Sequence, residues 1–523
     1  MIDQIKNNKK YFLFLSCLSI LSIVILIYGT STYKAGVSTD AAKYLSYAEN
    51  FAAGNGMVDY NKGIIAQWPP LYPLILACFS LITGLPVLDV GWLLNIISYG
   101  LLIWSGGYLF FRVFRNNRVF AVFATLILFT LPQLARIFAN VASDPLSILM
   151  LIIFFIEAIN YLETGKNRSL ITMIILSIAA TFIRYSALSM VATLSAVMLV
   201  RNISNLRRAF IRSALVGGIS GLPIVLWAIF HNLPINGSLF GRHMRAEPAQ
   251  NFIMSLNKFA EWFIPHRVQD IIPGWIWVLS LSIGLLLAYL LTKQKDRLIG
   301  LLNPSIFPAL FFSFIYFLML VFYTSYLEHR LTGNDRIHLV MLPSLIILLL
   351  SSVEKSIWEP FIKDKAIWFQ IGFGIIAGSL LVFPSYNLQK YIRVSHFEGD
   401  ISAYNIFNKR WLRESELVGE LLELEIEDSQ QIFSNNEGTV WFYLHRNIES
   451  LPHYPTEERN PSKVLEIKQI PSGSYIIWFN HPELSYKGFV PTPEELSTQL
   501  TLEELYALDI GSIYLVSGGN LAD

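Results

Sequence analysis

Two aspartates and two arginines stand at the boundaries of apolar segments, and their chemistry is complementary. Asp40 follows the first apolar run, and Asp144 precedes a proline where another run begins. Arg184 interrupts an apolar stretch where two segments meet, and Arg336 stands directly before a later one. Guanidinium groups bind phosphate oxygens, and a carboxylate can accept a proton from a hydroxyl. The set therefore points to chemistry on a lipid-borne phosphate at the lipid–water boundary.

Each of these residues also has a simpler interpretation, which the sequence leaves open. Asp40 falls in the first turn of a helix, where the helix dipole favours a carboxylate, so it could serve only to assist the cap. Asp144 before a proline at a helix start is ordinary capping chemistry. An arginine at a span end can extend its head toward lipid headgroups, the simpler interpretation for Arg330. A site is favoured because Asp40 and Asp144 are predicted on the same membrane face.

The element that must position Asp40 is a helix capped by Ser38 or Thr39, running to about Phe51 and ended by a Gly-Asn-Gly sequence. Apolar residues recur at helical spacing on one face: Ala41, Leu45, Ala48 and Ala52. The other face carries Asp40, Lys43, Tyr44 and Tyr47. We expect such a helix to lie along the membrane surface rather than to cross it.

Composition places most of the chain in a bilayer. Of its 523 residues, 54% are hydrophobic and only 15% charged, below the quarter or so that is usual in soluble domains. Residues 11–29 form an uncharged run of spanning length, interpreted as an uncleaved first span. A net charge of +1 gives no reason to expect a nucleic-acid partner. Cys17 and Cys78 fall in apolar segments and make no disulfide framework.

Hydropathy predicts eleven spans: 11–29, 87–111, 119–132, 146–162, 169–183, 186–200, 213–230, 275–292, 304–327, 338–352 and 366–385. Lys and Arg gather in alternate short connections, as expected for inner loops when the N-terminus lies inside. Residues 71–84 are apolar but short, and counting them as a span would invert the charge preference of every later loop. We therefore interpret them as a half-buried outer segment.

After residue 385 the polarity becomes mixed, which predicts two domains: a transmembrane domain, 1–385, with its outer loop at 30–86, and a small α/β domain, 386–523. Strands are expected at 430–435, 472–480 and 512–518, and helices at 410–425 and 492–500. An odd number of spans places this second domain on the same outer face as Asp40.

Several stretches resemble the GT-C superfamily of membrane glycosyltransferases, in particular the protein O-mannosyltransferase-like and lipid A aminoarabinose transferase-like enzymes. Residues 38–56 with 67–84, containing PPLYP, resemble the family's first outer loop. ASDPLSILML at 142–151 is similar to its second acidic loop. FIRYSALSM at 182–190 and NDRIHLVMLPSL at 334–345 resemble its arginine-containing loops. The resemblance covers roughly residues 11–385 in layout.

The resemblance implies an inverting transfer of a hexosyl or pentosyl group from a polyprenyl-phosphate donor. The acceptor would be a lipid, a glycan or a protein at the outer face of the cytoplasmic membrane, and the α/β domain would be extracytoplasmic. Asp40 matches the family's catalytic base and Asp144 its second acid. Arg184, Arg336 and Arg242 would hold the donor phosphate, while Lys43, Tyr44 and Tyr72 would line the substrate loop.

The chain departs from the protein mannosyltransferase pattern at one position. Those enzymes follow the catalytic Asp with Glu, whereas Ala41 follows here, which argues against protein mannosylation and against a metal site built on paired acids. His243, His266 and His329 are predicted on the same face, so a divalent metal stays open, but no ligand set and no other cofactor are predicted.

Two other functions fit the same residues. In a lipid-linked glycan flippase or transporter, the arginines would guide a pyrophosphate lipid and Asp40 would be dispensable. In a membrane scaffold, the α/β domain would bind a partner and its removal would abolish all function. Within a transferase, this domain would either help to bind the acceptor or act as a lid or stabilising module.

Overall fold

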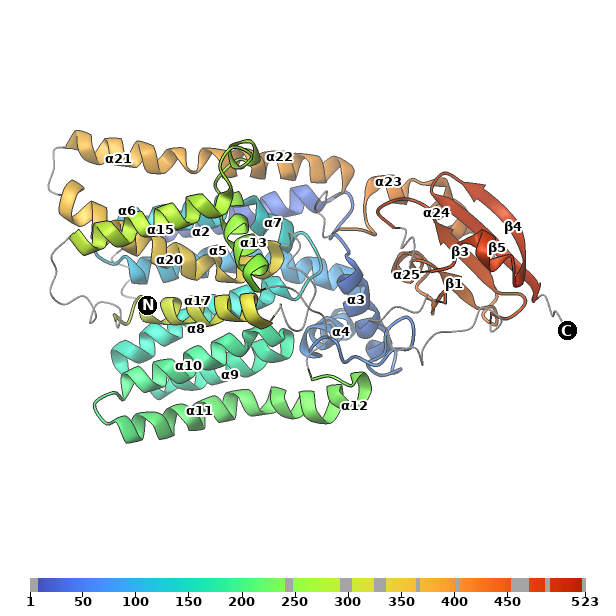
Figure 1. Ribbon diagram of the computed structural model, residues 1–523, viewed down its shortest axis with the longest axis horizontal. Helices are drawn as coiled ribbons and strands as arrows, with labels where there is room; N and C mark the ends of the chain where they lie inside the picture. Colours follow the sequence, from blue (N-terminus) through green and yellow to red (C-terminus); the bar gives the residue numbers. More distant parts are fainter. Residues whose placement is uncertain are drawn as a thin grey trace.

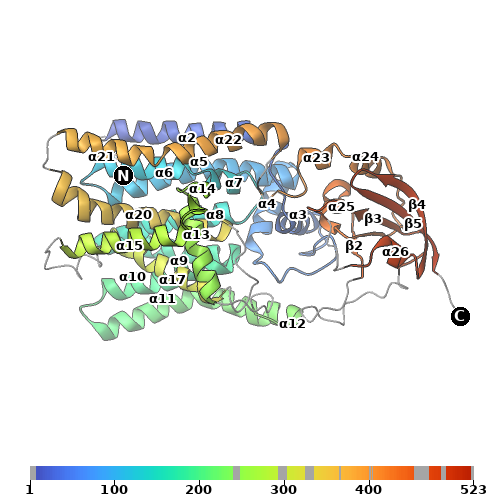
Figure 2. The same ribbon diagram turned by 45° about the horizontal axis from the view of Figure 1, so that its top comes forward.

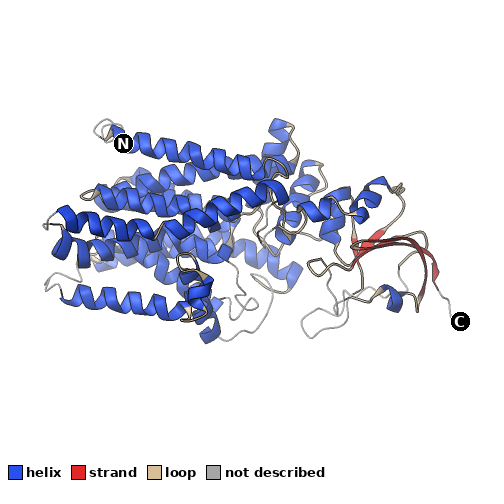
Figure 3. Ribbon diagram, turned by 90° about the horizontal axis from the view of Figure 1, so that it is seen from above, coloured by secondary structure: helices blue, strands red, loops and turns tan. Residues whose placement is uncertain are grey.

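The structure, a computed structural model, describes residues 8–239, 248–291, 303–323, 335–363, 367–399, 402, 405–452, 470–484 and 490–519. It consists of a long helical bundle with a small sheet beyond one end, as Figures 1 and 3 show from two directions. We call this end of the bundle the sheet end.

The first half of the bundle contains α2 and two short helices at the sheet end, followed by longer helices. Their bounds are α2 Lys9–Thr30, α3 Thr39–Ala52, α4 Leu71–Thr83, α5 Val87–Val113, α6 Arg118–Thr130, α7 Pro132–Phe138, α8 Asp144–Thr164, α9 Asn167–Ile183, η1 Tyr185–Ala187, α10 Leu188–Arg201, α11 Leu206–Trp227, η2 Ala228–Asn232 and α12 Leu233–Asn236. Buried side chains of α5, α6 and α8 make up much of the bundle's core.

The second half completes the bundle with α13 Pro248–Glu261, α14 His266–Gln269, α15 Gly274–Leu291, α17 Phe307–Leu318, η3 Met319–Tyr323, α19 Asp335–His338, η4 Leu339–Met341, α20 Leu342–Val353, η5 Glu354–Ile362, α21 Ile367–Ser379 and α22 Val382–Glu398. The last helix runs beyond the predicted boundary at residue 385, because α22 continues along α2. Their contact includes Ile392 against Gly29. The last helix of the bundle therefore ends at Glu398.

Six helices within the described residues are long and apolar enough to cross a membrane, or seven if the bent pair α6 and α7 is one span. These correspond to seven of the eleven predicted spans. The other four predicted spans also contain helices, but within the described residues these do not meet that test: α9 Asn167–Ile183, η1 with α10 Tyr185–Arg201, α15 Gly274–Leu291 and α17 with η3 Phe307–Tyr323. The structure therefore supports a polytopic helical protein, whereas the count of eleven spans stays a prediction.

The helix α3 forms almost as predicted, but its surroundings differ. Ser38 caps it, since its Oγ accepts from the Ala41 N–H at 3.2 Å. Tyr44 and Tyr47, predicted on the polar face, are only 2% and 3% exposed. This part of the polar face is buried, and α3 lies between the bundle and the C-terminal domain rather than at an open surface (Figures 1 and 2).

Helix α4 is the predicted half-buried segment. Tyr72 and Leu76 are fully buried, whereas Leu81 and Ile82 are exposed. The helix packs mainly against α3 and α5. Its thirteen residues end at Thr83, and the backbone of Gly84, which follows, is left-handed with φ of 70°, a conformation that favours glycine.

The C-terminal part holds a five-stranded sheet of order β2-β1-β3-β5-β4. Its elements are α23 Arg410–Arg413, α24 Glu416–Glu423, β1 Ile432–Ser434, α25 Glu437–Leu444, β2 Glu449–Ser450, β3 Tyr475–Phe479, α26 Pro493–Leu496, β4 Leu500–Leu508 and β5 Gly511–Gly519. β1 is parallel to β2 and β3, while β5 is antiparallel to β3 and β4. The three predicted strands form, the predicted helix 410–425 is two shorter helices, and β4 was not predicted.

Candidate active site

Asp40 and Asp144 each begin a helix, and they differ in exposure. The Asp40 side chain, in the first turn of α3, is about one-third exposed at 34%. The Asp144 side chain, at the start of α8, is fully buried. Ser143 is the capping residue of α8, and its side chain makes no capping hydrogen bond.

Arg336 bridges the two acids. Its Nε lies 2.8 Å from Asp144 Oδ2, and its Nη1 lies 3.1 Å from Asp40 Oδ2. The side chain is 11% exposed and projects from the short helix α19. A guanidinium can hold two carboxylates in this way because its N–H groups are fixed in one plane. Residues 40, 144 and 336, far apart in sequence, therefore lie in one ion-pair network.

Arg184 joins the same network through Asp144. Its Nη1 lies 2.7 Å from Asp144 Oδ2, so this one oxygen forms ion pairs with both arginines. Arg184 occupies the turn between α9 and η1 in extended backbone, which ends α9 and turns the side chain toward α8. We call Asp40, Asp144, Arg184 and Arg336 the acid–arginine cluster.

Two buried tyrosines lie beside the cluster. Tyr44 and Tyr72 pack ring to edge at 5.2 Å, and the Tyr44 hydroxyl lies 3.4 Å from Ser143 Oγ. Burial, followed by the charge of Asp40, raises the pKa of Tyr44, and burial likewise raises that of Tyr72. Both hydroxyls therefore stay neutral at physiological pH and can serve as hydrogen-bond donors, not as bases.

Lys43 does not join the cluster. Its ammonium lies 3.0 Å from Asp59 Oδ2 and near the rings of Tyr60 and Trp68. Asp59 is only 2% exposed and also accepts from the backbone of Asn61 and Gly63. Asp59 was missed by the sequence analysis, although an Asp followed closely by Gly is a turn signal that points to such backbone bonds.

Other predicted residues are placed only in part. Arg242, His243 and His329 lie outside the described residues. His266 begins α14. Within the described part of the chain, no three His, Cys, Asp or Glu side chains are grouped as metal ligands. A divalent metal therefore stays a prediction from the sequence.

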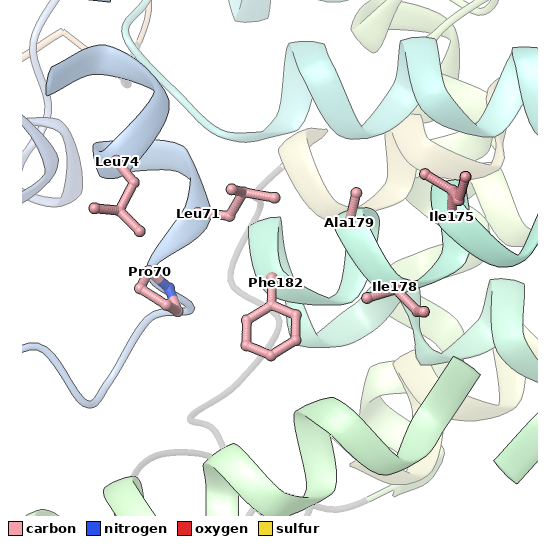
Figure 4. A pocket seen from close by; sticks show the side chains of 7 residues that line it. All are labelled: Pro70, Leu71, Leu74, Ile175, Ile178, Ala179 and Phe182. Atoms are coloured by element: carbon pink, nitrogen blue, oxygen red, sulfur yellow. The ribbon is translucent and has the colours of Figure 1, made fainter. Parts of the chain in front are cut away.

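An apolar groove runs between α4 and the end of α9 (Figure 4). Its volume is about 460 Å³, and every lining side chain is apolar: Pro70, Leu71, Leu74, Ile175, Ile178, Ala179 and Phe182. Phe182 stands two residues before Arg184, so the groove reaches the segment that carries one arginine of the cluster.

No protein-family model and no curated protein matches the chain. Among solved structures, ArnT from Cupriavidus metallidurans in the apo state is similar over 96% of this chain and 97% of that one, with a TM-score of 0.59 and 12% identity. The same enzyme bound to undecaprenyl phosphate is similar over 98% of both chains, with a TM-score of 0.58 and 11% identity.

The likeness extends over essentially the whole length, the sheet included, so it defines the class of fold. The chain has the fold of the GT-C membrane glycosyltransferases. Together with its apolar helices, this makes it a multi-pass membrane protein. The predicted resemblance in fold is thereby confirmed.

Proposed function

We propose that the protein is an inverting glycosyltransferase that moves a sugar from a polyprenyl-phosphate donor to a lipid, glycan or protein acceptor. The observation that carries this proposal is Arg336, which joins Asp40 and Asp144 in one ion-pair network. The fold and the binding of undecaprenyl phosphate by ArnT support a lipid-linked donor. The sheet end would face the outer side of the cytoplasmic membrane.

Asp40 is the better candidate for the base. Its carboxylate is one-third exposed, whereas Asp144 is fully buried and paired with two arginines. Asp40 would take the proton of the acceptor hydroxyl as that oxygen attacks the anomeric carbon. The bond from this carbon to the phosphate oxygen breaks, and the polyprenyl phosphate leaves with the electron pair. Attack opposite the leaving group inverts the anomeric centre.

Arg184 and Arg336 would stabilise the negative charge of the leaving phosphate. Each guanidinium carries five N–H groups, more than their carboxylate partners accept. Asp144 would hold both heads in place, since its Oδ2 contacts each within 2.8 Å. Arg242 would add a third phosphate contact. In many enzymes, fixed hydrogen-bond donors aimed at a developing charge make the largest contribution to the rate enhancement.

The apolar groove between α4 and α9 would take part of the polyprenyl chain. Its lining carries only apolar side chains (Figure 4), and one of them, Phe182, stands two residues before Arg184 in the sequence. A lipid lying there would bring its phosphate toward the cluster. Tyr44 and Tyr72 are too buried to contact a substrate directly and would instead help to hold Asp144 in place. Lys43 would lie on the side of the 30–86 loop that faces the acceptor.

The test is a transfer assay with purified protein in detergent. The protein is given a radiolabelled polyprenyl-phosphate sugar and an extract of envelope lipids and glycans, with no membrane gradient present. We expect a labelled product and release of polyprenyl phosphate. A flippase would form no product in detergent, yet it would move the labelled lipid across vesicle membranes. That pair of results would overturn the proposal.

A further inference from the structure

The short connection between α2 and α3 is held on both sides by other parts of the chain. On one side it pairs with the residues before α8. The Gly36 N–H donates to the Ala139 carbonyl at 2.9 Å, and the Val141 N–H donates to the Gly36 carbonyl at 3.0 Å. Asp40 stands four residues after Gly36, and Asp144 stands three residues after Val141. Both acids are thus tied to a single backbone contact.

On the other side the connection meets residues 405–408, which lead into the C-terminal domain. Asn405 Oδ1 accepts from the Val37 N–H at 3.0 Å, and the Val37 carbonyl accepts from the backbone of Ile406 and Phe407. The Asn408 amide donates to the carbonyls of Tyr33 and Ala35.

Both asparagines are fully buried. Asn405 Oδ1 also accepts from the Asn408 N–H at 3.0 Å, and its amide donates to the Asn408 carbonyl at 2.9 Å. The pair therefore forms one rigid clasp. We call Asn405 and Asn408 the asparagine clasp.

Gly36 shows how tightly the three segments meet. A Cβ added at this residue would lie 2.2 Å from Asn140 Oδ1 and 2.9 Å from the Cβ of Asn405. Those distances are below any real contact, so only glycine allows the connection to pass between the two side chains. Asn140 also contacts the segment between α22 and the C-terminal domain, because its amide donates to Ser402 Oγ at 3.2 Å.

The clasp is continuous with the folded C-terminal domain. Tyr443 on α25 donates its hydroxyl to the Phe407 carbonyl at 2.9 Å. Trp441 stacks on Tyr60 of the outer loop at 5.5 Å, and the Ile448 N–H donates to the Tyr60 carbonyl. A single apolar core contains residues of α3 and of the C-terminal domain together. Displacement of this domain would therefore move the start of α3.

We propose that Asn405 and Asn408 are positioning residues, which fix the start of α3 against the 139–141 segment and thereby set Asp40 relative to Asp144 and Arg336. The inference rests on the proposed function for its catalytic consequence. Its structural consequence does not, because the clasp would hold Asp40 in place whatever chemistry the cluster performs. The C-terminal domain then acts on the site through this clasp and does not need to touch a substrate.

The structural test is amide hydrogen exchange on the full-length protein in detergent, followed in the peptide covering 33–40. Asn405→Ala removes the acceptor of the Val37 N–H, so exchange of this amide should become at least about tenfold faster. Asn405→Asp keeps an acceptor for Val37 and should restore much of the protection. Unchanged exchange in Asn405→Ala would overturn the proposal.

A matched control is Asn435→Ala. Asn435 is similarly buried within the C-terminal domain, but among the described residues its side chain bonds both backbone groups of Phe479 in β3 and not the outer loop. This variant should speed exchange at Phe479 and leave Val37 protected. Equal loss of protection at Val37 in both variants would mean that the asparagines only stabilise the domain, and the proposal would be wrong.

The catalytic test compares the same variants in the transfer assay. Asn405→Ala and Asn408→Ala should lower kcat about tenfold or more with little change in KM for the donor, because a displaced base weakens the chemical step and not lipid binding. Asn435→Ala should keep kcat. If the variants alter exchange at Val37 but the wild type transfers no sugar, the proposed function fails and the clasp stands. If kcat is unchanged while exchange is faster, the clasp does not position the base.

Discussion

Asp144 is the residue on which both arginines of the cluster depend. It is fully buried, and its Oδ2 lies within 2.8 Å of a nitrogen of Arg184 and of Arg336. A buried charge left without its partner is strongly destabilising, because desolvation is no longer offset by the ion pair. Asp40, by contrast, is partly exposed and forms an ion pair with only one of the arginines, Arg336. The two acids should therefore differ in what their loss does to the protein.

Asp144→Asn should destabilise the protein by about 3–5 kcal/mol, since two guanidinium groups lose their common carboxylate. The measurement is thermal unfolding in detergent. Asp89→Asn is the control, because Asp89 pairs with the exposed Lys34 and such a pair contributes about 1 kcal/mol at most. Equal melting temperatures for Asp144→Asn and the wild type would show that the buried network does not support the fold.

Arg336→Lys should reduce transfer more than Arg184→Lys. Arg336 reaches Asp144 through Nε and Asp40 through Nη1, and a single ammonium cannot reproduce that fork. Arg184 contacts Asp144 through one nitrogen, which lysine can imitate in part. We expect a loss in kcat/KM of about a hundredfold or more for the first variant and a smaller loss for the second. The reverse order would contradict the bridging role.

The sequence indicated which charged residues matter, but not which residues they pair with. Asp40, Asp144, Arg184 and Arg336 stand out because they are predicted on one membrane face, where carboxylates and guanidinium groups have complementary chemistry. Their roles remain predictions. Asp59 was missed because no spacing rule indicates its ion pair with Lys43, although a turn signal points to its backbone bonds.

Local rules also explain which elements were predictable. The start of α3 was predicted because Ser38 supplies a cap that depends only on its neighbours. β4 was missed because its leucines and paired glutamates favour a helix, whereas here pairing with β5 decides. The burial of Tyr44 was also missed, since it depends on tertiary contacts with Trp68, Tyr72 and Ser143.

The contact between α3 and α25 should depend on pH. His445 Nδ1 lies 3.2 Å from Glu49 Oε2, and this hydrogen bond raises the pKa of the imidazole. A raised pKa means that the stabilisation is fully present below the unfolded value of about 6.5 and is lost as the pH rises through the folded value.

Thermal unfolding of the wild type and of Glu49→Gln at pH 5.5 and pH 8.5 measures this effect. At pH 5.5 the wild type should have a higher melting temperature than Glu49→Gln, and the difference between the two proteins should be smaller at pH 8.5. The effect should be small because both side chains are partly exposed. A difference that grows with pH would show that His445 is not the group responsible.

At the scale of the whole molecule, hydropathy predicted a polytopic helical protein because apolar length is a property of the sequence alone. The number of spans is harder to obtain, since within the described residues four predicted spans do not reach the length and hydropathy of a spanning helix. The position of the C-terminal domain against α3 could not be predicted, because it rests on tertiary contacts such as Tyr60 with Trp441. Those contacts are what join the sheet to the cluster.

The central claim is that the Asp40 carboxylate removes the acceptor proton at the acid–arginine cluster. The most direct measurement is product formation by Asp40→Asn with saturating radiolabelled donor, alongside donor binding to the same preparation. Asparagine has nearly the same shape but cannot accept the proton, so we expect transfer to fall by about a thousandfold or more, while the variant unfolds at close to the wild-type temperature and still binds donor. Wild-type rates of transfer by Asp40→Asn would contradict the account.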